Sequence, residues 1–296
     1  MTSRFSWQDL TFSAVIPGCV AVLVSYTSSA PLSCRAAEAA GASVAQIGGG
    51  LSMLGLGMGV TSIGLSLYYR TPVVTAWSTP GAALLVTSLP GTSINEAIGV
   101  FVFATGLILL CGVTGLFAKM MHYIPQALSA AMLGGILLRF GLNAFTSLQS
   151  NFALAGSMCL VYLLAKRALP RYAVVLALAA GLIAAGWQGD IALHGQSLTF
   201  AAPAFVMPHF TLSSIIGIGI PFFVVTMASQ NAPGIATLKA HGYHLPVSPL
   251  ISWTVLTALI LAPFGGFTIC IAAITAAICM GEDIQKKPKK RYMAAV

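Results

Sequence analysis

Charged side chains are scarce in this sequence. Asp, Glu, Lys and Arg make up 7% of its 296 residues, while 57% of the residues are hydrophobic. Soluble domains carry roughly 25% charged residues, so this chain cannot cover a water-facing surface and must place most of its exterior in lipid. Because a membrane span needs about 20 apolar residues, the composition predicts an all-α polytopic membrane protein with room for about ten membrane-embedded segments.

Metal-binding and catalytic patterns are also missing. The six cysteines show no CxxC spacing and lie mostly in apolar runs, which is typical of small core residues rather than of metal ligands or disulfides. No nucleophile motif or histidine–acid constellation stands near the end of a span, which argues against a membrane enzyme. We therefore expect no metal and no cofactor.

The net charge of +8 does not indicate a nucleic-acid partner. Basic residues stand singly at segment ends, and the one cluster, Lys286–Arg291, follows an apolar run. Basic residues beside a membrane span are typical of cytoplasmic anchors that contact anionic lipid. We expect membrane lipid, and no nucleic acid, as the partner of this cluster.

Apolar runs between charges and Gly/Pro breaks divide the chain into ten segments. They cover residues 8–31, 45–68, 72–89, 94–118, 124–142, 149–165, 172–187, 211–233, 247–262 and 263–280. The longest polar interruption is 188–209, so we expect a single membrane domain over 1–296. If the N-terminus is cytoplasmic and the segments alternate sides, 12 of the 14 Lys and Arg residues lie inside and only Arg35 and Arg139 lie outside. This orientation agrees with the positive-inside tendency.

Two segments, 72–89 and 263–280, are interrupted. Pro80 follows a β-branched run and suits the first turn of a helix, so residues 80–89 are predicted to form a half-helix preceded by extended chain. Pro263–Cys270 leads in the same way into the short apolar run 271–280. Extended backbone at membrane depth occurs only where protein or a cavity surrounds it, and paired interrupted segments indicate the binding site of a transporter.

The two parts of the chain share a further pattern. The run that begins at Pro17 reaches a polar patch before Pro31, and the run that begins at Pro221 reaches one before Pro233. Each patch is expected to end an otherwise apolar span. Because seven segments separate the two starts, the second copy is predicted to be inverted in the membrane.

Several strings closely resemble the benzoate/proton symporter (BenE) family, in particular its inner-membrane branch. The most specific are TAWSTPGAALLVTSLPG (75–91), TMASQNAPGIATLKAHGY (226–243) and AAITAAICMG (272–281). The resemblance covers the whole chain in order. It implies a fold similar to the uracil and nucleobase–ascorbate transporters, with seven plus seven inverted spans forming a core domain and a gate domain.

The same resemblance divides the chain into repeats. It implies a first core repeat at 8–118, a first gate portion at 119–187 and an incomplete second repeat at 211–296. Family members continue for roughly four more spans, so the expectation is a C-terminally short relative in which alternating access by rocking bundles is in question.

In the fold that the chain resembles, substrate lies between the N-termini of the two half-helices. Here these N-termini are expected near Ser78, Thr79 and Gly81 and near Phe267 and Thr268. The positive helix ends and the hydroxyls would hold a carboxylate, and the side chains that would flank its ring are those of Trp77, Phe267 and Tyr26. The alternative is that the hydroxyls cap helices and the aromatic rings fill space.

Gln230 and Asn231 are polar residues inside a span, just before Pro233. They lie about where the nucleobase relatives carry a glutamate. They are predicted to hydrogen-bond substrate, and the alternative is that they bond the backbone that Pro233 loosens. Glu96 is predicted to act with Ser93 as a capping box rather than as a proton site.

The resemblance implies a secondary transporter for proton-coupled uptake of benzoate or a related aromatic carboxylate across the bacterial inner membrane. Since no membrane-centred acid is evident, the proton is expected to travel on the substrate carboxylate. The alternatives are a transporter of a nucleobase-like neutral ring and a truncated membrane protein that does not transport. The oligomeric state stays open, with a homodimer as one alternative.

Overall fold

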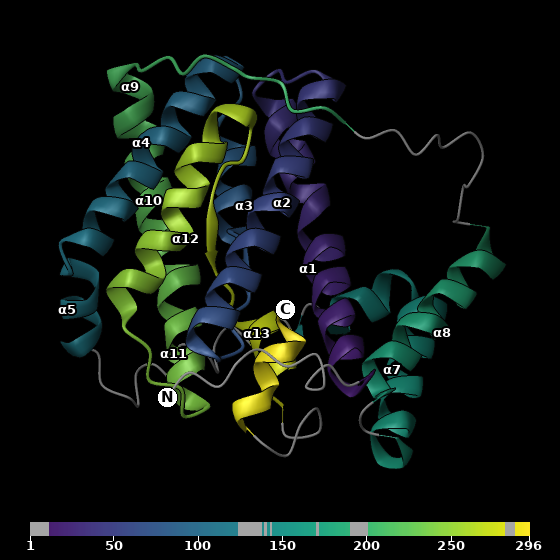
Figure 1. The fold of residues 1–296 in the computed structure, drawn as a ribbon. Helices are drawn as coiled ribbons and strands as arrows, with labels where there is room; N and C mark the ends of the chain where they lie inside the picture. The colour runs from purple at the N-terminus through teal and green to yellow at the C-terminus, as the bar shows by residue number, and fades with distance from the viewer. Residues whose placement is uncertain are drawn as a thin grey trace.

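A computed structural model describes residues 12–123, 138, 141–142, 144–169, 172–189, 201–281 and 288–296. The predicted segment 124–142 falls almost entirely outside these residues. Most of the described chain is helical, and the helices form a bundle around two short strands (Figure 1).

Four stretches of the described chain are long and apolar enough to cross a membrane. They are Val44–Tyr69, Ile94–Val113, Leu212–Ala240 and Val247–Phe264. The prediction of a polytopic membrane protein is therefore confirmed. Two of these helices, α2 (Val44–Tyr69) and α4 (Ile94–Val113), begin with capping boxes, at Ser43 with Gln46 and at Ser93 with Glu96. The capping role predicted for Glu96 is confirmed.

Helix α1 (Phe12–Ala39) and the helix that begins with α9 (Leu212–Ser214) are both longer than predicted. The second runs through α10 (Ile220–Thr226) to the end of α11 (Ala232–Ala240). The polar patches before Pro31 and Pro233 therefore lie inside helices, and the expectation that they end their spans is wrong.

Two π-helical turns explain how the second of these helices continues through its prolines. They are η3 (Ile215–Gly219), just before Pro221, and η4 (Met227–Asn231), just before Pro233. A proline inside a helix has no N–H to donate, and its ring clashes with the carbonyl four residues earlier. A turn closed by i→i+5 bonds widens the helix at that carbonyl, so the chain stays helical.

Three shorter helices flank the bundle. Helix α4 ends at Val113, and α5 (Leu116–Tyr123) begins after Gly115, which has a φ of 70°, so the predicted single run 94–118 is divided. Helices α7 (Phe152–Ala168) and α8 (Ala173–Gln188) pack against each other beside α1 (Figure 1).

The two interrupted segments each contain a strand followed by a short helix, as predicted. Strand β1 (Thr75–Trp77) leads into α3 (Thr79–Ser88), and β2 (Ile269–Ile271) leads into α13 (Ile274–Met280). The strands are antiparallel, with Thr75 opposite Ile271 and Trp77 opposite Ile269. The second half-helix starts three residues later than expected, because Ile269–Ile271 pair with β1 instead of starting a helix.

Side chains of helices on both sides supply further hydrogen bonds to the two extended segments. On the β1 side, Ser66 of α2 bonds both the N–H and the C=O of Val73 at 3.0 Å, and Ser62 accepts from the N–H of Thr75 at 3.0 Å. On the β2 side, Asn231 Oδ1 accepts from the N–H of Ile271 at 3.2 Å. Side chains thus satisfy strand edges that water would satisfy in a soluble protein.

The strand pair is enclosed within the bundle. Strand β2 runs beside α2 and α12 (Val247–Leu261), which ends in the 3-10 turn η5 (Ala262–Phe264) (Figure 1). The extended chain before α9 crosses one end of the bundle, where His209 N–H donates to the Asn95 carbonyl at 2.9 Å.

The last described segment, the 3-10 helix η6 (Pro288–Ala294), packs on α1 and α13. Arg291 is buried and donates from Nη1 to the Met280 carbonyl at 3.0 Å, at the C-terminal end of α13. The expectation that the whole cluster 286–291 contacts lipid is therefore wrong for Arg291, because its guanidinium binds a helix end.

We predict that Ser66→Ala lowers the free energy of unfolding by about 1–3 kcal/mol, because it leaves the carbonyl of buried Val73 without its partner. The Val73 N–H keeps the Thr71 carbonyl as an acceptor, at 2.7 Å. The matched control is Ser52→Ala in the same helix, since the Ser52 hydroxyl bonds only the Gly48 carbonyl one turn away. Denaturant unfolding of the purified protein in detergent micelles measures both variants. Equal destabilisation by the two substitutions would contradict the role of Ser66 as a partner for the strand.

Candidate functional site

Hydroxyl groups from three helices meet at the start of α3. Ser78 is fully buried, and its Oγ accepts from the N–H of Gly81 at 3.1 Å, which caps the helix. Thr226 of α10 donates to the same Oγ at 3.5 Å, and the hydroxyls of Thr79 and Ser29 of α1 lie 2.8 Å apart. The capping alternative is thus confirmed for Ser78, and its contact with substrate stays a prediction. The positive end of α3 lies among these hydroxyls, in an arrangement that suits an anion.

Gly81 allows a close approach over this first turn. A Cβ at Gly81 would lie 2.7 Å from the ring of Phe222 and 2.7 Å from Ser78 Oγ. The absence of a side chain therefore lets Phe222 of α10 pack directly on the capped end of α3.

Phe267 and Thr268 do not lie at the N-terminus of the second half-helix, so that prediction is wrong. They precede β2, and because Ile269 pairs with Trp77, they lie at the end of the strand pair that Ser78 follows. The Phe267 ring is 5% exposed and packs 5.9 Å from Phe101 and 6.5 Å from Phe222, measured between ring centroids. The buried hydroxyl of Thr268 bonds the Phe267 carbonyl.

Asn231 lies at the opposite end of the strand pair, where β2 turns toward α13. Its Oδ1 holds the N–H of Ile271, and its Nδ2 donates to Met227 Sδ at 3.4 Å. The backbone that Asn231 satisfies is therefore that of β2, and not the backbone loosened by Pro233. Its neighbour Gln230 is only partly buried.

Tyr26 and Trp77 form an aromatic pair between α1 and β1. Their ring centroids are 5.0 Å apart, and the Tyr26 hydroxyl donates to the Leu51 carbonyl of α2 at 2.9 Å. Trp77 is 2% exposed, and its Nε1 has no hydrogen-bond partner among the described residues. An unsatisfied buried donor of this kind costs about 1–3 kcal/mol.

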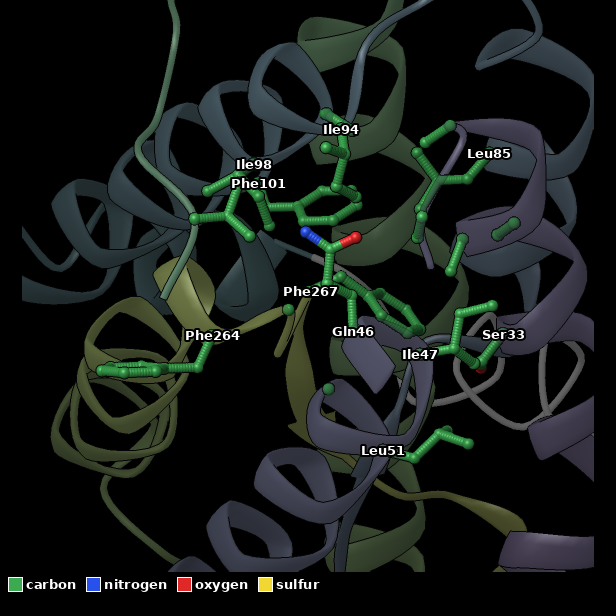
Figure 2. A pocket seen from close by; sticks show the side chains of 18 of the residues that line it. Ser33, Gln46, Ile47, Leu51, Leu85, Ile94, Ile98, Phe101, Phe264 and Phe267 are labelled. Carbon is green, nitrogen blue, oxygen red and sulfur yellow. The ribbon is translucent and has the colours of Figure 1, made fainter. Parts of the chain in front are cut away.

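Two cavities lie beside these residues. The smaller, of about 50 Å³, has Gln46, Phe101 and Phe267 on its wall (Figure 2). The larger, of about 750 Å³, is bounded by α1, α2, β1 and the C-terminal segment. Ligand sites in proteins have volumes of about 300–1,000 Å³, so the larger cavity can accept a small aromatic molecule.

The larger cavity also has hydroxyl groups that the sequence prediction missed. Thr75 and Ser62 line it, and the Thr75 Oγ1 lies 2.9 Å from Ser62 Oγ and 2.7 Å from Thr61 Oγ1 of α2. Ser62 and Ser66 are four residues apart, and this spacing in the sequence predicts a polar face on α2.

Apart from the partly buried Gln230, the predicted site residues fall into three groups. Ser78, Thr79, Gly81, Phe267 and Thr268 gather at one end of the strand pair, Tyr26 and Trp77 pack together beside it, and Asn231 holds its other end.

Comparisons with known proteins show which family this chain resembles. The profile of the family described as "Benzoate membrane transport protein" matches residues 8–296. The inner membrane protein YdcO of Escherichia coli (strain K12) is 52% identical over 281 residues, which cover 95% of this chain and 72% of YdcO. The benzoate membrane transport protein of Acinetobacter baylyi (strain ATCC 33305 / BD413 / ADP1) is 38% identical over 289 residues, which cover 98% of this chain and 73% of that protein. The chain belongs to the BenE family of benzoate membrane transport proteins, a family of membrane transporters and not of enzymes.

Proposed function

We propose that this protein is a secondary active transporter that takes up benzoate or a related aromatic carboxylate with protons across the bacterial inner membrane. The observation that carries the proposal is the buried strand pair, which places the capped N-terminus of α3 and its hydroxyls inside the bundle. The name of the Acinetobacter baylyi relative supports benzoate as the substrate.

In this proposal the carboxylate binds at the first turn of α3. The helix end attracts negative charge, and Ser78 and Thr79 donate hydrogen bonds. The rings of Trp77, Tyr26 and Phe267 flank the substrate ring. The Gln230 amide hydrogen-bonds the substrate. Asn231 positions β2 through its bond to the Ile271 N–H.

The proposed fold is the seven-plus-seven inverted repeat of the uracil and nucleobase–ascorbate transporters. The order of elements supports it, since α1, α2 and β1–α3 are matched by α10–α11, α12 and β2–α13. In this fold 8–118 and 211–296 belong to the two core repeats, 119–187 belongs to the gate, and the N-terminus is cytoplasmic.

The position of the described acids supports proton coupling through the substrate. Of the two described acidic residues, Glu38 is next to the last residue of α1 and Glu96 is in the first turn of α4. Neither lies in the middle of its helix. In this proposal the substrate carboxyl group carries the proton.

We predict that proteoliposomes containing the full chain accumulate labelled benzoate when the outside is more acidic than the inside. A protonophore should abolish the accumulation, and labelled uracil should not be taken up. Protein-free liposomes are the essential control, because neutral benzoic acid crosses lipid by itself. Uptake of uracil would favour the neutral-ring alternative, and equal benzoate uptake with and without protein would contradict transport.

We predict that Thr79→Val raises the KM for benzoate about tenfold, because the loss of one hydrogen bond to a charged group costs about 1.5 kcal/mol. The matched control is Thr87→Val in the same helix, where the hydroxyl is exposed and bonds only the Leu84 carbonyl. Initial rates of protein-dependent uptake measure both variants. Identical KM values for the two variants would show that the Thr79 hydroxyl does not bind the substrate.

A further inference from the structure

Tyr26 lines the larger of the two cavities, and its hydroxyl bonds a residue that lines the smaller one. Helix α1 lines the larger cavity with residues between Gly18 and Tyr26, and the smaller one with Ser33, Ala36 and Ala37. Helix α2 changes from the smaller cavity to the larger between Leu54 and Gly55. The hydrogen bond from Tyr26 to Leu51 joins a residue of the larger cavity to a residue of the smaller. The phenol therefore bridges α1 and α2 close to the point where α2 passes from the smaller cavity to the larger.

Trp77 lies behind this phenol. Side chains alternate along a strand, so Trp77 is on the same face of β1 as Thr75, which lines the larger cavity. Trp77 itself lines neither cavity, and the Tyr26 ring packs against it. Its indole N–H is buried without a partner among the described residues, so it is a donor that a substrate acceptor could satisfy.

Gly55 makes the closed position of Tyr26 possible. A Cβ at Gly55 would lie 2.5 Å from the Tyr26 hydroxyl oxygen, which is too close for any atom pair of this kind. The glycine thus lets the phenol lie against α2 and reach the Leu51 carbonyl one turn earlier. One turn later, a Cβ at Gly59 would meet nothing within 4 Å.

From these contacts we propose that Tyr26 is a gate between the two cavities, and that the Trp77 indole N–H is a specificity-determining donor for the substrate carboxylate. In the closed state described here, the phenol is held by its bond to Leu51 and covers Trp77. When Tyr26 swings off α2, the cavities join and Nε1 becomes available to a carboxylate oxygen. The ligand class rests on the proposed function, whereas the gate does not.

The gate is tested without ligand by the fluorescence of Trp77. Trp187 and Trp253 are 93% and 61% exposed, so they can be replaced by Phe together with Trp7, which leaves Trp77 as the single tryptophan. In proteoliposomes, Gly55→Ala should increase quenching of Trp77 by acrylamide several-fold, because it displaces the phenol. Gly59→Ala should leave the quenching at the parent value. Equal quenching in the two variants would overturn the gate.

Tyr26→Phe provides a second test that adds no atoms to the site. It keeps the ring but removes the bond to Leu51, so the open state becomes more populated and benzoate should bind more tightly. Binding of labelled benzoate to the purified protein measures this change. An unchanged or weaker affinity would overturn the role of the Tyr26–Leu51 bond.

The donor role is tested by Trp77→Phe in the same binding assay. Loss of the indole N–H should weaken benzoate binding about tenfold and leave the binding of toluene, which has no carboxylate, unchanged. Unchanged benzoate affinity would overturn the role of Trp77. If benzoate fails to bind the parent protein while Gly55→Ala still exposes Trp77, the substrate proposal fails and the gate stands.

Discussion

An extended backbone inside a membrane protein has to find partners for all its N–H and C=O groups within the protein, because lipid offers none. The strand pair β1–β2 meets this demand in two ways. Three residues of each strand pair with the other strand, and the outer edges are satisfied by Ser62 and Ser66 of α2 and by Asn231 of η4. The positions of α2 and of the helix containing η4 are consequently tied to the strands.

The same demand explains how closely the helices approach. A Cβ at Gly234 of α11 would lie 2.4 Å from the Ile271 carbonyl, so that helix packs directly against the backbone of β2. With the helices this near, each strand can end in the protein interior and pass into a half-helix. The capped end of α3 and the aromatic pair of Tyr26 and Trp77 then lie beside the strands, and neutral hydrogen bonds and ring contacts hold them there.

The sequence predicted those features of the fold that depend on local chemistry. Pro80 in the first turn of a helix and the capping box of Ser93 and Glu96 both follow from spacing alone, and both are present. The full lengths of α1 and of the helix that ends at Ala240 could not be predicted, because proline normally indicates a break. The start of α13 was placed too early, since only pairing with β1 keeps residues 269–271 extended.

For the site, the sequence identified residues but not all of their partners. The position of Ser78 and Thr79 at the start of a half-helix predicts their place in the site, and they lie among hydroxyls that α1 and α10 contribute. That Ser66 completes a strand edge and that Gly55 admits the Tyr26 phenol are tertiary facts. The spacing of residues within one helix cannot predict these two contacts, because each depends on a second segment of the chain.

The π-helical turn η4 changes which way its helix faces. In a regular α-helix, two residues five apart point in directions that differ by about 140°. Thr226 and Asn231 are five apart, yet one bonds Ser78 at the start of α3 and the other bonds Ile271 in β2. A turn closed by i→i+5 bonds brings such residues back to nearly the same face. The extra residue in this turn thus lets one continuous helix hold both ends of the strand pair. The direction in which its side chains point, more than the length of the helix, aligns the two halves of the site.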